Sequence, residues 1–315
     1  KDRESEKNKK FQVIQNRQDS DMAAKKNQKN RRIIMKVLIT GANGQLGHDV
    51  SAELEKRHIE NRGIDIEDLD ITKKEDVACY ISDFDPDVVV HCAAYTAVDK
   101  AEDEPEKCEK INFKGTENIA LACKENDAAM LYISTDYVFD GISKEIWSPE
   151  DEPEPGSVYG RTKYQGEQAV RDNLEKHFII RIAWAFGKNG NNFVKTMLDL
   201  GKKNIVPKVV DDQFGSPTYT RDLAVLIADM IETDKYGTYH ATNEGFCTWH
   251  EFASEIFKKA KMDIKPIPCK TEDYPFKAKR PKNSRLSKDK LTEKGFNRLP
   301  SWQDALDRYF KELEE

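Results

Sequence analysis

A tyrosine and a lysine four residues apart, Tyr159 and Lys163, are the side chains of this chain best suited to moving a proton. Four residues make about one helical turn, so both side chains are expected on one face of a helix. A lysine cation beside a phenol favours the phenolate and lowers the tyrosine pKa from about 10 toward working pH. The pair predicts acid–base chemistry at an alcohol or a carbonyl group. The alternative is an ordinary Tyr and Lys on the surface of an amphipathic helix.

A hydroxyl group at the end of an apolar run is a third candidate. Residues 130–135 read MLYIST, which is typical of a buried strand that ends in Ser134 and Thr135. Open α/β sheets bind their ligands at the carboxyl ends of the strands. We therefore expect Thr135 to hold a carbonyl oxygen that Tyr159 protonates. A helix N-cap or a turn residue is the alternative for Thr135.

Three glycines near residue 40 predict a place for a dinucleotide beside these groups. Gly41, Gly44 and Gly47 follow the apolar run 37–39, and a helix-like pattern begins after them. In this pattern the first glycine makes a tight turn, the second admits a pyrophosphate and the third lets the helix pack against the strand. The helix N-terminus then faces the phosphates. An ordinary strand-to-helix turn is the alternative, since a glycine pattern alone is weak evidence.

An acidic residue stands where such a fold places its ribose contact. Asp65 lies about 20 positions beyond the glycines, at the end of the run NRGID. Its carboxylate would accept hydrogen bonds from ribose hydroxyls and repel a 2′-phosphate, which favours NADH. Arg62 is close in sequence and could weaken that preference.

Longer stretches carry a more specific signal. The chain resembles the extended short-chain dehydrogenase/reductases and, among them, the dTDP-4-dehydrorhamnose reductase family, and the resemblance covers 35–315. The matching strings are GANGQLG at 41–47, DLDIT at 68–72, AAYTAVDKAE at 93–102, STDYVFDG at 134–141, YGRTKYQGE at 159–167, RIAWAFG at 181–187, NNFVKTML at 191–198, DQFGSPT at 212–218 and RPKNSRL at 280–286.

The resemblance implies an activity and roles for individual residues. Members of the family reduce the C4 ketone of a dTDP-linked 6-deoxyhexulose with NADH or NADPH and give dTDP-L-rhamnose. By this resemblance Tyr159 is the general acid, Lys163 holds the nicotinamide ribose and Thr135 orients the carbonyl. The implied cofactor contacts are Gly41, Gly44, Gln45, Leu46, Gly47, Asp65, Asp70, Ile71, Ala93, Ala94, Tyr95, Thr96, Tyr159 and Lys163.

Fewer residues are predicted to bind the substrate than the cofactor. The resemblance places Asp136 and Trp184 at the sugar nucleotide together with Thr135, and we add Asn192, Gln213 and Arg280 as candidates. A guanidinium such as that of Arg280 can grip a diphosphate with two hydrogen bonds. Structural alternatives remain: Trp184 could be core, Asp70 and Ile71 could cap a helix, and Arg280 could be a solvated charge.

Other reactions on the same fold stay open. The nucleotide-sugar dehydratases it resembles carry an acid directly after Thr-Asp, where this chain has Tyr137, so elimination is disfavoured. An epimerase or a reductase of another nucleotide sugar remains an alternative. A non-catalytic NAD(P)-binding regulatory subunit is a third.

Composition narrows the partners and the compartment. The net charge is −6, and because residues 1–34 carry +6, the remainder carries about −12, which argues against nucleic acid as a partner of the folded part. The six cysteines form no C-x-x-C pair and the histidines show no metal spacing, which predicts a reduced, cytoplasmic protein without a placed metal site. Mg²⁺ is possible by family analogy but is not placed, and a homodimer is possible. No apolar run is long enough for a membrane span or an export signal.

Alternating strand-like and helix-like runs predict an α/β fold with a Rossmann-type doubly wound parallel sheet. The family resemblance implies that the region beyond residue 185 partly completes this sheet and partly forms a smaller C-terminal substrate lobe. We expect the NAD(P)-binding domain at 35–185, its sheet completed by about 219–245, and a mainly substrate-binding lobe at 186–315. Residues 1–34 are polar and basic, which predicts a disordered or non-native leader. The alternative for them is a basic arm that touches nucleic acid or a membrane surface.

Overall fold

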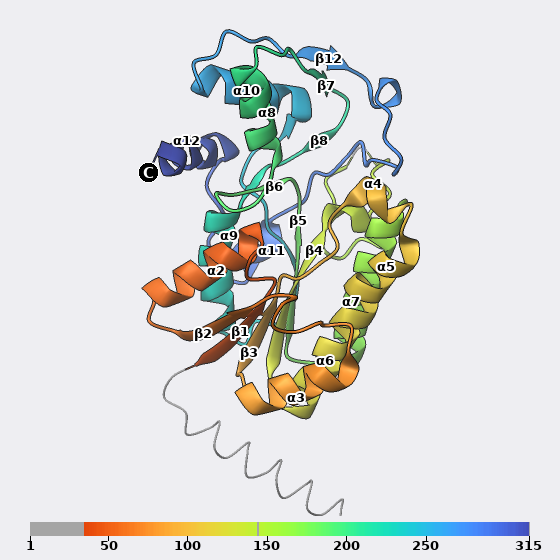
Figure 1. Cartoon of the computed structure of the whole chain (residues 1–315), viewed down its shortest axis with the longest axis vertical. Coiled ribbons are helices and arrows are strands. Elements are labelled where there is room, and N and C mark those ends of the chain that lie inside the picture. The colour runs from red at the N-terminus through yellow and green to blue at the C-terminus, as the bar shows by residue number, and fades with distance from the viewer. Residues whose placement is uncertain (1–34, 144, 315) are drawn as a thin grey trace, which may run out of the picture.

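Six parallel strands form the central sheet of the computed structural model, which describes residues 35–143 and 145–314 (Figure 1). The leader predicted at 1–34 lies outside the described residues. The strands are β1 (Lys36–Thr40), β2 (Glu60–Ile64), β3 (Val88–His91), β4 (Ala129–Thr135), β5 (His177–Ile182) and β10 (Gly237–His240), in the order β10-β5-β4-β3-β1-β2. The chain therefore reverses its direction of travel between β1 and β3, and such a switch point opens a crevice at the carboxyl ends of the strands.

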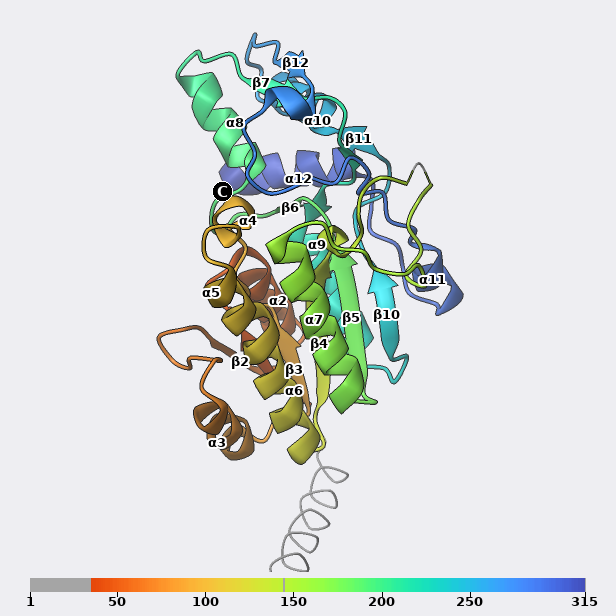
Figure 2. The same ribbon diagram turned by 90° about the vertical axis from the view of Figure 1, so that its right-hand side faces the viewer.

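Both faces of this sheet are buried, because successive side chains of each strand point to opposite sides. On β1, Val37 and Ile39 enter one apolar core, while Leu38 enters the other, and none of the three is exposed. Helices α2 (Gln45–Lys56) and α9 (Thr220–Ile231) cover the first face. Helices α3 (Lys74–Phe84), α6 (Thr116–Glu125) and α7 (Val158–Asn173) cover the second (Figure 2).

The helical stretch between β3 and β4 at 105–125 is interrupted. It consists of α5 (Pro105–Glu109), a π-helical turn η1 (Lys110–Gly115) and α6. In the wide turn, the Asn112 carboxamide accepts from the Tyr95 N–H at 2.8 Å and donates to the Tyr95 carbonyl at 3.1 Å. The side chain thereby holds the loop after β3, which is a use that helical periodicity does not reveal.

A smaller lobe lies beyond the carboxyl ends of the strands (Figure 1). Its helices are α8 (Phe193–Lys202), α10 (Trp249–Lys259) and α12 (Trp302–Glu314), and they pack around buried aromatic residues such as Phe186, Phe252 and Tyr309. The short strands are β6 (Ala185–Phe186), β7 (Lys208–Val210), β8 (Phe214–Gly215), β9 (Thr218–Tyr219), β11 (Cys247–Thr248) and β12 (Ile267–Cys269). The remaining short helices are α4 (Val98–Ala101), η2 (Asp136–Val138), η3 (Thr271–Asp273) and α11 (Asp289–Glu293).

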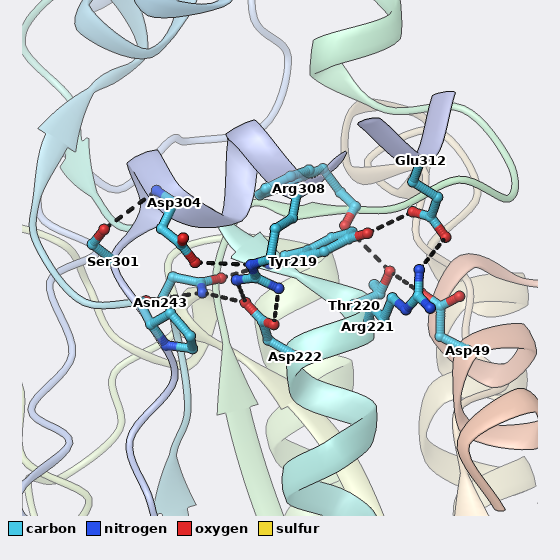
Figure 3. Close-up of polar contacts among 12 residues, drawn as sticks. Asp49, Tyr219, Thr220, Arg221, Asp222, Asn243, Ser301, Asp304, Arg308 and Glu312 are labelled. Atoms are coloured by element: carbon cyan, nitrogen blue, oxygen red, sulfur yellow. Dashed lines mark hydrogen bonds and ion pairs between the residues drawn. The ribbon is translucent and has the colours of Figure 1, made fainter. Parts of the chain in front are cut away.

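Polar contacts fasten the lobe to the sheet-bearing part where α12 crosses the start of α9 (Figure 3). The Arg308 guanidinium grips Asp222 with two hydrogen bonds of 2.5 and 2.8 Å. The Tyr219 hydroxyl donates to Glu312 at 2.5 Å. These contacts join α12 of the lobe to the start of α9, which covers one face of the sheet.

Candidate active site

A cleft of about 1120 Å³ opens where the strands end, between the sheet and the lobe. Its walls come from the glycine loop after β1, the ends of β2 to β5, the start of α7 and the segment that leads into the lobe. The predicted residues that line it are Gly41, Gly44, Gln45, Leu46, Gly47, Asp65, Asp70, Ile71, Ala93, Ala94, Thr96, Thr135, Asp136, Tyr159, Lys163 and Trp184.

The glycine loop makes a turn that side chains would block. Gly41 has φ +70, and a Cβ there would lie 2.7 Å from the Ala93 nitrogen. A Cβ on Gly47 would lie 2.2 Å from the Gly41 carbonyl oxygen. Gly44 is the N-cap of α2 and brings no side chain to that helix end. The loop thus brings the N-terminus of α2, which has no side-chain cap, to the lining of the cleft, and such a helix end fits the pyrophosphate of a dinucleotide.

Asp65 follows β2 directly and lies against this loop. Its two carboxylate oxygens accept from the N–H groups of Asn43 at 2.9 Å and Ile66 at 2.8 Å. Arg62 does not line the cleft; its guanidinium lies over the Phe84 ring, 4.4 Å from the centroid. The carboxylate is therefore the charge that this edge of the cleft presents, and Arg62 does not offset it.

Tyr159 and Lys163 lie one turn apart near the start of α7. Ser157 caps the helix by accepting from the Gly160 N–H at 3.1 Å. Gly160 lets the helix approach closely, since a Cβ there would lie 2.1 Å from the Tyr137 carbonyl oxygen. The Tyr159 ring consequently meets the Tyr137 ring edge to face, with centroids 5.5 Å apart. The first turn of α7 is pressed against the residues that follow β4.

Burial dominates the pKa values of both Tyr159 and Lys163. Burial raises the pKa of Tyr159, and a hydrogen bond with Thr135 only partly opposes this effect. Burial lowers the pKa of Lys163 to about 7, and its ammonium donates to the Ile133 carbonyl at 2.7 Å. The rise caused by burial outweighs any lowering of the Tyr159 pKa by Lys163, so that lowering stays a prediction. The phenol is held in its protonated, donating form.

Thr135 caps a turn and also lines the cleft, and its role at a carbonyl oxygen stays a prediction. Its hydroxyl oxygen accepts from the Tyr137 N–H at 3.2 Å and so caps the 3-10 turn η2, while its side chain also lines the cleft. The hydroxyl donates to the Asp136 carboxylate at 3.1 Å. Burial raises the pKa of Asp136 to about 6, and hydrogen bonds from Ser284 and Thr135 oppose that rise.

Trp184 lines the lobe side of the cleft in an unusual backbone conformation. Its φ is +50, which is uncommon for a bulky residue. Its indole stacks on Trp249 of α10 with centroids 3.9 Å apart, and a Cβ on Gly215 would lie 2.8 Å from the ring. The surrounding lobe therefore holds the indole in place. Trp249 carries no local sequence signal that would have pointed to this contact.

Four predicted residues lie outside the cleft lining. The Tyr95 hydroxyl donates to the Glu104 carboxylate at 3.0 Å, and the Tyr95 N–H donates to the Asn112 side chain. Asn192 caps α8 and donates to Gln45 at 3.1 Å, so it touches the cleft through another side chain. Gln213 is buried and donates to Thr271 at 3.1 Å.

Arg280 is the fourth of these residues. It is not a solvated charge, because only 14% of its side chain is exposed. The guanidinium donates to the Tyr137 hydroxyl at 2.9 Å and pairs with Asp99. It lines a second hollow of about 570 Å³ that Lys277, Lys279 and Lys282 also line. Tyr137 lines the first cleft, so Arg280 stands between the two spaces.

Neither a metal-binding cluster nor a membrane-spanning helix is found in the part of the chain that the structure describes. Within residues 35–143 and 145–314, no three His, Cys, Asp or Glu side chains gather as a metal site, so no Mg²⁺ site is placed. Among the same residues, no helix combines the length and the apolarity that crossing a membrane requires.

Comparison with known proteins gives a single family for nearly the whole described chain. Residues 35–315 match the family model described as the RmlD substrate binding domain. A curated dTDP-4-dehydrorhamnose reductase of Aggregatibacter actinomycetemcomitans is 41% identical, over 86% of this chain and 97% of its own. The spore coat polysaccharide biosynthesis protein SpsK of Bacillus subtilis is 37% identical, over 88% of this chain and 97% of its own.

Solved structures agree with that result. A dTDP-4-dehydrorhamnose reductase of Bacillus anthracis, crystallised in complex with NADP, matches with a TM-score of 0.87 at 44% identity. It is covered over 100% of its length by 89% of this chain. A UDP-glucose 4-epimerase of Thermus thermophilus in complex with NAD has a TM-score of 0.77 at 20% identity, a likeness of fold alone. The predicted Rossmann-type α/β fold is confirmed.

Proposed function

The chain belongs to the RmlD substrate binding domain family, and from that premise we propose that it is a dTDP-4-dehydrorhamnose reductase. It reduces the C4 ketone of dTDP-4-dehydro-L-rhamnose to dTDP-L-rhamnose with NADH or NADPH. The observation that carries the proposal is the meeting of a protonated, buried phenol, a hydroxyl and a glycine cradle in one cleft. Reduction of a ketone needs a proton donor beside a hydride donor, and this cleft has room for both.

Each group of the chain has a part in this reaction. The loop Gly41–Gly47 would hold the dinucleotide pyrophosphate, and Asp65 its adenosine ribose. Bound there, the reduced nicotinamide supplies the hydride. Thr135 holds the ketone oxygen within reach of Tyr159, whose phenol gives up its proton as negative charge develops on that oxygen. Lys163, when protonated, donates to the nicotinamide ribose.

Cofactor choice follows from the edge that Asp65 occupies. The carboxylate repels a 2′-phosphate, and Arg62 lies over Phe84 instead of beside it. We therefore propose that NADH is used at least as well as NADPH. The Bacillus anthracis relative was crystallised with NADP, so use of both cofactors is expected.

The nucleotide end of the substrate is assigned to the second hollow. A dTDP-sugar carries a diphosphate, and the hollow has Arg280 and three lysines on its walls. Tyr274 and Phe276 stack there with centroids 4.4 Å apart and offer an aromatic surface to a base. Since Arg280 also bonds Tyr137 beside Tyr159, this placement brings the sugar into the cleft. We assign residues 35–185 and about 219–245 to the cofactor, and the remainder of 186–315 to the substrate.

The test is oxidation of NADH, and separately NADPH, with dTDP-4-dehydro-L-rhamnose made in place from dTDP-glucose by a dehydratase and a 3,5-epimerase. The wild-type protein is expected to oxidise cofactor, and Tyr159→Phe is expected to lose about 10²- to 10⁴-fold in kcat while binding NADH normally. Tyr164→Phe, five residues further along α7 and outside the cleft lining, is the matched control and should keep its activity. A Tyr159→Phe protein with normal turnover would exclude Tyr159 as the acid.

A further inference from the structure

A fully buried carboxylate lies one helical turn beyond Lys163. Glu167 is 0% exposed, and its oxygens accept hydrogen bonds from three side chains. Ser134 Oγ and Arg181 Nε donate to Oε1 at 2.6 and 2.8 Å. Arg171 and Arg181 donate to Oε2 through their Nη2 atoms at 2.6 and 2.8 Å. The carboxylate is thereby held from both sides, and these contacts keep the pKa of Glu167 below its ordinary value despite its burial.

These contacts join the elements that carry the reacting groups. Glu167 stands on α7, the helix that carries Tyr159 and Lys163. Ser134 is the residue directly before Thr135 at the end of β4. The hydrogen bond between Ser134 and Glu167 therefore ties the strand that presents the hydroxyl to the helix that presents the phenol. A shift of about 1 Å between two such groups is enough to slow a reaction strongly.

Arg181 extends the tie to the approach to α7. From β5, its Nη1 donates to the Pro149 carbonyl at 3.3 Å, in the segment that leads toward Tyr159. Its guanidinium also lies over the Phe139 ring, 5.0 Å from the centroid, and near His240 of β10 at 3.5 Å. Burial and the Arg181 charge lower the pKa of His240, so this histidine is a neutral acceptor.

The surroundings of Lys163 give Glu167 a second effect. Burial lowers the pKa of Lys163, and Glu167 is the strongest influence in the opposite direction. The groups that face Lys163 from other elements are His91, Cys92, Cys108 and the Tyr132 ring. Burial raises the pKa of both thiols, and it lowers that of His91 to about 3, so all of them are neutral at working pH. Within this set the negative charge beside Lys163 is that of Glu167.

We propose that Glu167 is the positioning residue of this active site. It holds α7 against the end of β4, and it places a negative charge one helical turn from the Lys163 ammonium, which binds the nicotinamide ribose. The proposal rests on the reductase function proposed above, with Glu167 acting through Ser134 and Lys163 and touching no substrate.

The test compares the pH dependence of three variants. Glu167→Gln keeps the size and removes the charge, so Lys163 loses its proton at lower pH and the alkaline fall of kcat/KM moves down by about one pH unit or more. Glu167→Asp keeps the charge, and its alkaline fall should stay where the wild type has it. Ser134→Ala removes only the tie to β4; it should lower kcat several-fold without moving the alkaline fall.

Two further measurements keep the outcomes distinct. If Glu167→Gln does not fold with Arg181 left unpaired, Glu167→Met/Arg181→Met removes both charges and should show the same displacement. NADH binding, followed against pH by cofactor fluorescence, needs no turnover. In Glu167→Gln its affinity should begin to fall at a lower pH than in the wild type. If the alkaline fall of kcat/KM does not move in a folded variant that lacks the Glu167 charge, the electrostatic role is overturned. If kcat is unchanged in Ser134→Ala, the positioning role of the hydrogen bond between Ser134 and Glu167 is overturned. A wild type that binds NADH but reduces no sugar nucleotide would refute the proposed function alone.

Discussion

Replacing Lys163 with methionine should stabilise the protein while it destroys the activity. The side chain is 3% exposed, and burial lowers its pKa from 10.5 to about 7. The unfolded chain therefore binds one more proton than the folded chain between about pH 7 and pH 10.5, so this lysine makes stability rise with pH across that window. Its presence costs the fold most at pH 7 and below.

The size of the effect follows from the two pKa values. At about 1.4 kcal/mol per pKa unit, the buried amine costs about 4 kcal/mol at pH 7 and about 2 kcal/mol at pH 9. Methionine forfeits the hydrogen bond to the Ile133 carbonyl, worth about 1 kcal/mol, and keeps a favourable contact with the Tyr132 ring. The net gain is about 3 kcal/mol at pH 7 and about 1 kcal/mol at pH 9.

Urea unfolding of wild type and Lys163→Met at both pH values measures this gain. The difference between the two proteins should shrink by about 2 kcal/mol from pH 7 to pH 9, because the other titrating groups cancel in the comparison. Lys258→Met on α10 is the control; with 76% of the lysine exposed, it should change stability little and equally at both values. A Lys163→Met protein less stable than wild type, or a gain independent of pH, would refute the reasoning.

Three further outcomes are expected. Gly47→Ala should abolish NADH binding, or prevent folding, because the added Cβ would lie 2.2 Å from the Gly41 carbonyl oxygen; calorimetric titration that gives wild-type affinity would contradict the close approach. Asp65→Asn should raise the preference for NADPH over NADH about tenfold, as a carboxylate facing a 2′-phosphate is removed; the ratio of kcat/KM values measures this, and an unchanged ratio would count against Asp65. Trp249→Ala should raise KM for the sugar nucleotide more than it lowers kcat, because Trp184 loses its stacking partner at 3.9 Å, and steady-state kinetics that show the reverse would argue for a role in chemistry.

Local patterns were enough for the sheet and for the glycine loop. The apolar run 37–39 and the helix pattern after Gly47 predict β1 and α2, because burial on both faces and helical spacing are written into neighbouring residues. The apolar run in 130–135 likewise led to Thr135 at the end of β4. Family strings supplied Trp184, whose apolar surroundings alone would have suggested core.

Contacts between distant segments explain what sequence reasoning missed. Glu167 reads as one more polar residue on α7, and only the fold brings Arg181 and Ser134 to its carboxylate. Arg280 was predicted at the substrate, but its partner Asp99 lies 181 residues earlier. The burial of Lys163 also escapes the sequence pattern, since the spacing of Tyr159 and Lys163 reveals their common face but not how deeply the amine is buried.

Reduction at the sugar C4 is tested most directly with NADH that carries deuterium at both hydrogen positions of the nicotinamide C4, with dTDP-4-dehydro-L-rhamnose as the substrate. We expect the wild type to form dTDP-L-rhamnose with deuterium at the sugar C4, detected by NMR and mass spectrometry. Tyr159→Phe should form no labelled product over the same time. A product without deuterium, or with deuterium at another carbon, would contradict reduction at C4.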